Sequence, residues 1–261
     1  MTIAGYVDSH CHLHDTRGVD PDEVVAAARA AGVTTMIDVG CDSASTASAI
    51  EFATRYPGTV FATAGLHPHE AVHGVETILR YLDDPTVIAI GEAGLDYYYD
   101  HSPHPAQREA FAAQIQLAHE RDLPLIIHTR DAWEETFDIL MAEGAPTNTI
   151  FHCFTGGADE ARRCLGLGAY LSFSGIVTFK SAIDVHEAAR LCPPDRLLAE
   201  TDSPYLAPVP YRGRSNQPAF VTHVVQFLAD LRREPVETVR EATVTSALAA
   251  FPRLVFQRDG S

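Results

Sequence analysis

Lysine is almost absent from this sequence. Lys180 is the only lysine among 19 basic residues, and 35 acidic residues bring the formal net charge to -16. A surface with this balance repels a phosphate backbone, which argues against tight non-specific binding to duplex DNA. It does not exclude a nucleic-acid substrate, because two bound divalent cations would add about four positive charges and could attract a phosphate into an acidic cleft.

Paired cysteines and long apolar runs are also lacking. The five cysteines include no CxxC pair, which argues against a disulfide framework or zinc ribbon and predicts free thiols in a reducing cytoplasm. No stretch reaches the ~18 consecutive apolar residues of a membrane span. The opening MTIAGYVDSH has no basic segment followed by an apolar one, so we expect no signal peptide. These absences predict a cytoplasmic protein without membrane contact, and we infer no obligate protein partner.

The sequence does contain a regular alternation of short β-branched runs and amphipathic stretches. Eight runs are typical of strands and begin near residues 6, 33, 60, 87, 123, 148, 169 and 197. Helical patterns lie between and after them, near 21–31, 43–56, 75–83, 105–121, 132–143, 158–166, 181–191, 218–231 and 235–250. Eight βα repeats with short connections predict an α/β protein of the (β/α)8 TIM-barrel class, and a doubly wound open sheet is the alternative.

The length supports the same class. A chain of 261 residues fits one such barrel, for which roughly 250 residues is typical. No change in composition marks a second domain, so we expect residues 1–261 to form a single domain.

Side chains of metal-ligand type lie at the ends of six of the eight runs. Barrel enzymes use residues at the carboxyl ends of their strands, so these side chains would meet on one face. They are His10, His12, His67, Glu92, His128, His152 and Asp202. Because His10 and His12 are two positions apart, their side chains would share one face of a strand and could close on a single metal ion.

Each of these residues alone has a simpler interpretation. A single histidine after an apolar run is more often a hydrogen-bonded structural residue, Glu92 could form a salt bridge, and Asp202 could begin a turn. Independent accidents, however, should not all fall at the same end of successive strands. A buried ring of acceptor groups is also costly without cations between them. The pattern as a whole therefore predicts a metal site.

The donor set limits the metal chemistry. Four histidines and two carboxylates suit Zn²⁺, Mn²⁺, Fe²⁺ or Co²⁺, with Mg²⁺ possible at the position richer in carboxylate. They are too many ligands for one tetrahedral zinc ion but suit two ions that share a carboxylate, and Glu92 is the natural bridge in barrel order. Two ions about 3.5–4 Å apart stabilise both the attacking and the leaving oxygen of a phosphoryl displacement and lower the pKa of a bound water.

Seven motifs carry a family resemblance. HCHLHD, GLHP, GEAGLDYY, IIHTRD, HCFTG, LLAETDSPYL and RGRSNQP occur in this order. Together they resemble the TatD family of metal-dependent hydrolases, the TatD-type deoxyribonucleases, over essentially the whole chain. The resemblance implies an amidohydrolase-like (β/α)8 barrel with a divalent metal centre.

The resemblance also implies a role for each strand-end residue. One metal would be held by His10, His12 and Asp202. The other would be held by His128 and His152, with Glu92 as the bridging ligand. Asp202 would also be the base that orients or deprotonates the water.

Further residues could contact a substrate. The resemblance implies that His67 contacts a substrate phosphate, and Arg130 could contact a phosphate or a carboxylate. The run Tyr97–Tyr99 could stack bases, or the three rings could simply pack against their neighbours. The proline-rich stretch 203–217 is the longest loop and follows the eighth strand, on the side where barrel loops carry out chemistry.

Three functions are compatible with these residues. The family implies a deoxyribonuclease, an exonuclease that cleaves phosphodiesters at single-stranded DNA ends with a water activated by two metal ions. The alternative is an amide or ester hydrolase, such as an aminoacyl-tRNA deacylase, since the same water could attack a carbonyl. Lysine-bridged hydrolases are disfavoured because position 92 is Glu and Lys180 lies beyond the seventh strand. A non-catalytic metal-binding scaffold is the third possibility. We expect the first, with DNA as a transient partner.

Overall fold

A computed structural model of the protein describes residues 5–254. Within these residues eight strands follow one another in the sheet order β1 to β8, the order of a (β/α)8 barrel. The strands are β1 (Tyr6–Cys11), β2 (Val33–Asp38), β3 (Val60–Ala64), β4 (Val87–Asp96), β5 (Leu125–Arg130), β6 (Thr149–Phe151), β7 (Tyr170–Phe173) and β8 (Leu197–Ala199). The predicted eight-stranded α/β class is therefore confirmed.

Eight α-helices lie between and after these strands in the described part of the chain. They are α1 (Pro21–Ala30), α2 (Ser43–Arg55), α3 (His104–Arg121), α4 (Trp133–Glu143), α5 (Ala158–Gly166), α6 (Ile183–Leu191), α7 (Val221–Arg232) and α8 (Val236–Ala250). Local signals explain several starts. Asp20, for example, caps α1 by accepting the N–H of Asp22, and Pro21 occupies the first turn.

The helix predicted near 75–83 is wrong. The segment forms two short 3₁₀ turns, η2 (Val75–Thr77) and η3 (Leu79–Tyr81). It begins after Gly74, whose φ is 76°, and ends before Pro85, which disfavours the α conformation at the preceding residue. The interval between these two residues is too short to offset the cost of nucleating an α-helix.

The chain divides into two compact units. Among the described residues, the first unit comprises 5–38 and 152–250, and the second comprises 39–151 and 251–254. Each unit carries its own strands and its own candidate ligands, and the two are described in turn. The prediction that residues 1–261 form a single domain stays a prediction.

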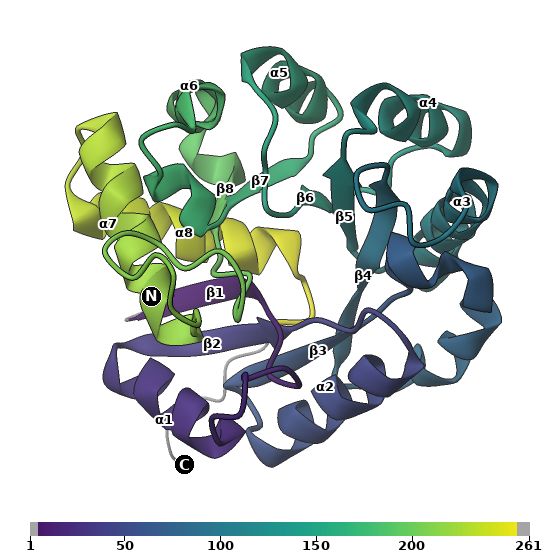
Figure 1. Ribbon diagram of the computed structural model, residues 1–261, viewed down its shortest axis with the longest axis horizontal. Helices are drawn as coiled ribbons and strands as arrows, with labels where there is room; N and C mark the ends of the chain where they lie inside the picture. Colours follow the sequence, from purple (N-terminus) through teal and green to yellow (C-terminus); the bar gives the residue numbers. More distant parts are fainter. Residues whose placement is uncertain (1–4, 255–261) are drawn as a thin grey trace. The chain divides into compact units, whose positions relative to one another are not determined.

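In the first unit, β1 has a neighbour on each side. It pairs in parallel with β2, and Figure 1 shows the two strands side by side with α1 packed outside them. On its other side, the N–H of Asp202 donates to the carbonyl of His10 at 2.9 Å, and the N–H of His12 donates to the carbonyl of Ser203 at 2.8 Å. The first strand therefore adjoins the segment after the last strand, as a closed barrel requires.

A buried carboxylate fixes this junction. Asp8 on β1 is fully buried and accepts hydrogen bonds from the N–H and the Oγ1 of Thr201, at 2.8 and 2.6 Å. Ser9 adds a hydrogen bond from its hydroxyl to the carbonyl of Ala199. These bonds satisfy polar groups that would be costly to leave unpaired in the core.

In the second unit, β4 is buried along its whole length and pairs in parallel with β3 and β5. Figure 1 shows α3 and α4 on the outer side of β4 and β5. Gly94 on β4 has a φ of 139°, and a Cβ there would lie 1.9 Å from the carbonyl oxygen of His128 on β5. Only glycine permits this close approach, so the GEAGLD sequence brings Glu92 and Asp96 next to the strand that carries His128.

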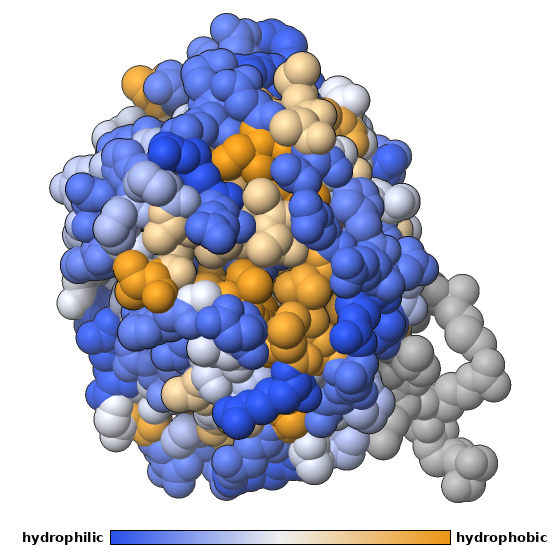
Figure 2. Space-filling view, turned by 90° about the vertical axis from the view of Figure 1, so that its right-hand side faces the viewer, coloured by the Kyte–Doolittle hydropathy of each residue, from blue (hydrophilic) through white to orange (hydrophobic). Residues whose placement is uncertain are grey.

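No helix of residues 5–254 is both long enough and apolar enough to cross a membrane. Figure 2 shows one face of the surface, on which hydrophilic side chains predominate and apolar side chains form smaller areas between them. Scattered exposed apolar residues of this kind are normal for a protein surface.

Candidate metal-binding sites

The first unit brings together three of the predicted ligands, His10, His12 and Asp202. The two histidine Nε2 atoms lie 3.3 Å apart, and Oδ1 of Asp202 lies 3.8 Å from that of His10 and 3.5 Å from that of His12. Bonds of 2.0–2.1 Å to a tetrahedral zinc ion would separate two nitrogen ligands by about 3.3 Å. The spacing of the three side chains therefore fits a single divalent cation.

His152 and Glu200 extend this cluster. The ring of His152 stacks on that of His10, with centroids 4.0 Å apart, and its Nδ1 lies 3.4 Å from Oε1 of Glu200. Glu200 is fully buried, and among the described residues nothing donates a hydrogen bond to its Oε2. A buried carboxylate oxygen without a donor is costly, so this oxygen also favours a cation nearby.

Asp202 is the most accessible acid of this cluster and is held ionised. Burial alone would raise the pKa of Asp202, but the hydrogen bond from His12 and the positive charges of His152 and His10 outweigh burial and lower it. The Asp202 side chain is 13% exposed, whereas that of His10 is fully buried. Asp202 therefore presents a carboxylate that can bind a cation or accept a proton.

The second unit brings together His67, Glu92 and His128. Oε1 of Glu92 lies 2.9 Å from Nδ1 of His128 and 3.5 Å from Nε2 of His67. One ligand atom from each of the three lies within 4.8 Å of the others. The sulfur of Cys41, which follows β2, lies 3.6 Å from the other oxygen of Glu92. This cluster too has nitrogen and oxygen donors at a spacing that suits a divalent cation.

Asp96 orients the second cluster. Its buried carboxylate contacts Nε2 of His128 at 3.2 Å and Nε2 of His69 at 3.0 Å. Burial alone would raise the pKa of Asp96, but hydrogen bonds from His128, His69 and the N–H of Tyr99 hold it well below the usual range. A carboxylate behind a metal-binding histidine fixes the orientation of the ring and increases its basicity.

His67 is neutral near pH 7. Burial lowers the pKa of its imidazole to about 4. Its Nδ1 accepts the backbone N–H of His69 at 3.1 Å, so the neutral ring carries its proton on Nε2, which faces Glu92. A proton at that atom makes His67 a hydrogen-bond donor toward the cluster.

The predicted residues thus fall into two groups. The first unit holds His10, His12, His152 and Asp202, and the second holds His67, Glu92, His128 and Arg130. The assignment of His128 and His152 to one ion, and of Glu92 as a bridge, stays a prediction.

Asp96 and Glu200 were not among the predicted site residues. Their signals are present in GEAGLD and LLAETD, where each lies an even number of positions from a predicted ligand, Glu92 or Asp202. In a strand that spacing places both carboxylates on one face.

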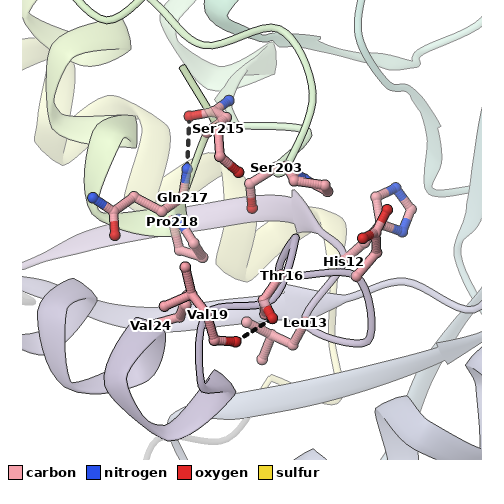
Figure 3. Close-up of a pocket in the computed structure, with 12 residues that line it drawn as sticks. His12, Leu13, Thr16, Val19, Val24, Ser203, Ser215, Gln217 and Pro218 are labelled. Carbon is pink, nitrogen blue, oxygen red and sulfur yellow. Dashed lines mark hydrogen bonds between the residues drawn. The ribbon is translucent and has the colours of Figure 1, made fainter.

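A small pocket of about 150 Å³ lies beside the first cluster. Figure 3 shows it between the segment that follows β1 and the loop that follows β8. Leu13, Val24 and Pro218 form apolar walls, Ser203 and Gln217 add polar groups, and His12 stands at one edge. The long loop predicted to lie near the site therefore encloses space next to a candidate ligand.

Residues 7–252 match the family model described as TatD related DNase. The chain belongs to this family. The chain is 41% identical over 250 residues to the uncharacterized metal-dependent hydrolase YabD of Bacillus subtilis, a match that covers 94% of this chain and 98% of that protein. It is 38% identical over 243 residues to the 3'-5' ssDNA/RNA exonuclease TatD of Erwinia billingiae, covering 89% and 93% of the two chains.

A solved structure agrees. The crystal structure of the TatD homologue YJJV from Escherichia coli superposes with a TM-score of 0.88 at 28% identity, covering 95% of this chain and 98% of that one. These likenesses confirm the family and the barrel class that the sequence predicted. The protein is a metal-dependent hydrolase of the TatD family.

Proposed function

We propose that this TatD family member is an exonuclease that hydrolyses phosphodiester bonds at the ends of single-stranded DNA with two divalent metal ions, Zn²⁺, Mg²⁺ or Mn²⁺. The observation that carries the proposal is the presence, in each unit, of imidazole and carboxylate groups at a spacing that suits a cation. The 38% identity to a single-strand exonuclease supports this substrate class. The proposed ligands are His10, His12, His152 and Asp202 of the first unit and Glu92 and His128 of the second.

The chain's own residues would divide the chemistry among them. When bound, the cations lower the pKa of a water and stabilise charge on phosphate oxygens. Asp202, ionised by its lowered pKa, accepts the proton that the attacking water loses. His67 would donate a hydrogen bond from its Nε2–H to a phosphate oxygen, because its ring is neutral and its Nδ1 is already occupied as an acceptor. Arg130 adds a positive charge for the same substrate.

The cysteines support a reducing location. All five cysteines are free thiols, and Cys11, Cys164 and Cys192 are buried. Proteins of oxidising compartments more often pair their cysteines. We therefore also propose the cytoplasm as the place of action.

The test is hydrolysis of end-labelled single-stranded DNA by metal-stripped protein, with Mg²⁺, Mn²⁺ or Zn²⁺ restored in separate reactions. We expect a ladder of products from one end that returns with metal and is absent for Glu92→Gln. Glu51→Gln is the matched control, because it makes the same chemical change at an exposed residue of the same unit that pairs with Arg55.

Two results would contradict the proposal. Cleavage by Glu92→Gln at the wild-type rate and metal content would remove Glu92 from the site. No cleavage by folded, metal-loaded wild type would overturn the nuclease function, and aminoacyl-tRNA would be the next substrate to assay.

A further inference from the structure

Two tyrosines beside the second cluster are exposed and hold an arginine between them. The Arg130 guanidinium lies 4.0 Å from the ring centre of Tyr98 and 4.7 Å from that of Tyr99. The two residues are 59% and 52% exposed. Tyr99 also stacks loosely on His101, with ring centroids 5.7 Å apart. The neighbouring Tyr97 is held more tightly, because its ring stacks on His104 at 3.6 Å and its hydroxyl bonds to Glu135. Tyr97 anchors the loop, whereas Tyr98 and Tyr99 face solvent.

Among the described residues Arg130 has no acidic partner, unlike Arg55 and Arg108 of the same unit. Arg55 pairs with Glu51 at 3.0 Å and Arg108 with Glu135 at 3.1 Å. Within residues 5–254, no carboxylate lies within the 4.0 Å ion-pair distance of the Arg130 guanidinium. In a protein of net charge -16, a guanidinium held by aromatic rings and unneutralised by an acid is available to an anion.

Asp96 ties these tyrosines to the candidate ligands. Its Oδ1 accepts the N–H of Tyr98 at 2.9 Å and that of Tyr99 at 3.0 Å, while its Oδ2 contacts His128. The buried Gln107 holds Asp96 in place, since its amide group bonds to both the N–H and the C=O of that residue. One carboxylate therefore sets the position of the aromatic pair relative to a candidate metal ligand.

A series of ring contacts links the second cluster to the aromatic pair. The ring centroids are 4.7 Å apart for His128 and His67, 4.3 Å for His67 and His69, and 5.7 Å for His69 and Tyr99. Arg130 also follows His128 by two positions on β5, so the two side chains share a face of the strand. A strand with a phosphate at the second cluster could therefore place a neighbouring base beside the aromatic pair.

We propose that Tyr98, Tyr99 and Arg130 form a nucleotide subsite that requires an unpaired base. A base stacks on an exposed tyrosine ring, and the adjoining phosphate pairs with Arg130. Stacking of this kind depends little on sequence and cannot be made by a base inside a duplex. The inference rests on the proposed nuclease function and deepens it, because it names the part of the molecule that selects single strands.

The test compares two substrates of equal length, an oligothymidylate and a strand of abasic nucleotides that keeps the phosphates but has no bases. We expect Tyr98→Leu to raise the KM for oligothymidylate about tenfold, within the range for loss of one stacked base, and to affect the abasic strand much less. Arg130→Gln should raise the KM for both strands, since both carry phosphates. Tyr98→Phe, which keeps the ring, should restore the oligothymidylate KM.

Arg80→Gln is the matched control. It removes the same charge from another arginine–tyrosine pair of the second unit, where Arg80 lies 4.6 Å from the ring centre of Tyr81. It should leave the KM for both strands at the wild-type value. Thermal unfolding of every variant shows whether it is folded. If Tyr98→Leu is not folded, the KM values of Arg130→Gln for the two strands decide the result.

The outcomes separate the inference from the proposed function. Wild type that hydrolyses neither strand overturns the nuclease function and this inference with it. Wild type that cleaves oligothymidylate, while Tyr98→Leu and Arg130→Gln both keep the wild-type KM, overturns the subsite alone. Equal KM for a blunt duplex and for the single strand would also overturn it.

Discussion

The two units hold similar ligands but expose them differently. In the first unit, the side chains of His10 and His152 are 0% and 4% exposed. In the second, those of His67 and His128 are 12% and 18% exposed. The imidazoles of the first cluster are therefore the more buried ones, and those of the second are the more accessible ones. We propose that this difference leaves the second cluster the more open of the two to a substrate.

The carboxylates that support the two clusters, Glu200 and Asp96, also differ in how close their contacts come to the surface. Glu200 lies beneath His152 and contacts the N–H of Cys153, so it serves the first cluster alone. Asp96 reaches from His128 to the exposed loop of Tyr98 and Tyr99. Substitutions in the first cluster should therefore affect metal binding and proton transfer. Substitutions in the second cluster should also affect the affinity for substrate.

The largest expected effect is that of Asp202→Asn. An amide cannot accept the proton of the attacking water, so kcat should fall by about 10²–10⁴. Steady-state kinetics at saturating metal, with metal content from elemental analysis, measures this loss. Asp195→Asn, at an exposed residue of the same unit, should retain wild-type kcat. A kcat for Asp202→Asn near that of the control would show that another group takes the proton.

Asp96→Asn tests whether the second cluster depends on its supporting carboxylate. Loss of such a partner costs about 10–100-fold in metal affinity or activity. When activity is measured against metal concentration, the variant should therefore need about 10–100-fold more metal to reach half of its maximal activity. The KM for oligothymidylate should rise as well. Weaker metal binding with an unchanged KM would separate the aromatic pair from the ligand cluster.

His67→Ala tests access to the second cluster from the substrate side. Loss of one hydrogen bond to a charged phosphate should raise KM or lower kcat by about tenfold, with no loss of metal. Elemental analysis beside kinetics checks this result. If the variant loses one equivalent of metal, His67 is a ligand and not a donor to phosphate.

The smallest expected effect concerns acid stability. The folded pKa of Asp96 lies below its unfolded value, so its contribution to stability is present above about pH 4 and is lost as pH falls further. In metal-free protein, Asp96→Asn should lower the Tm by about 5 °C at pH 7. This difference should shrink below about pH 4. A difference that does not change with pH would mean that packing, and not charge, explains it.

The sequence predicted the eight strands well because they follow from a simple periodicity. The metal ligands stay a prediction, although the structure brings their side chains into two clusters. His10 and His12 share a face because strand side chains alternate, and ligands at strand ends gather because parallel strands end at one edge. The helix near 75–83 could not be excluded in this way, because its apolar spacing suited a helix while Gly74 and Pro85 left too little length.

The supporting carboxylates could not be assigned from sequence. GEAGLD and LLAETD each contain two acids an even number of positions apart. Nothing in the spacing tells whether Glu92 or Asp96 faces a cation and which one orients a histidine. That choice depends on distances such as the 3.2 Å between Asp96 and His128, which strand pairing sets.

The junction between β1 and the segment after β8 has a consequence for how the protein is made. It joins Asp8 to Thr201, which are 193 positions apart in the chain. During synthesis, His10 and His12 leave the ribosome long before Asp202 does. Contacts between residues so far apart in sequence are slow to form. The first cluster is therefore complete only in a chain that extends to Asp202. A nascent or truncated chain that ends before Asp202 has His10 and His12 but lacks the Asp202 carboxylate.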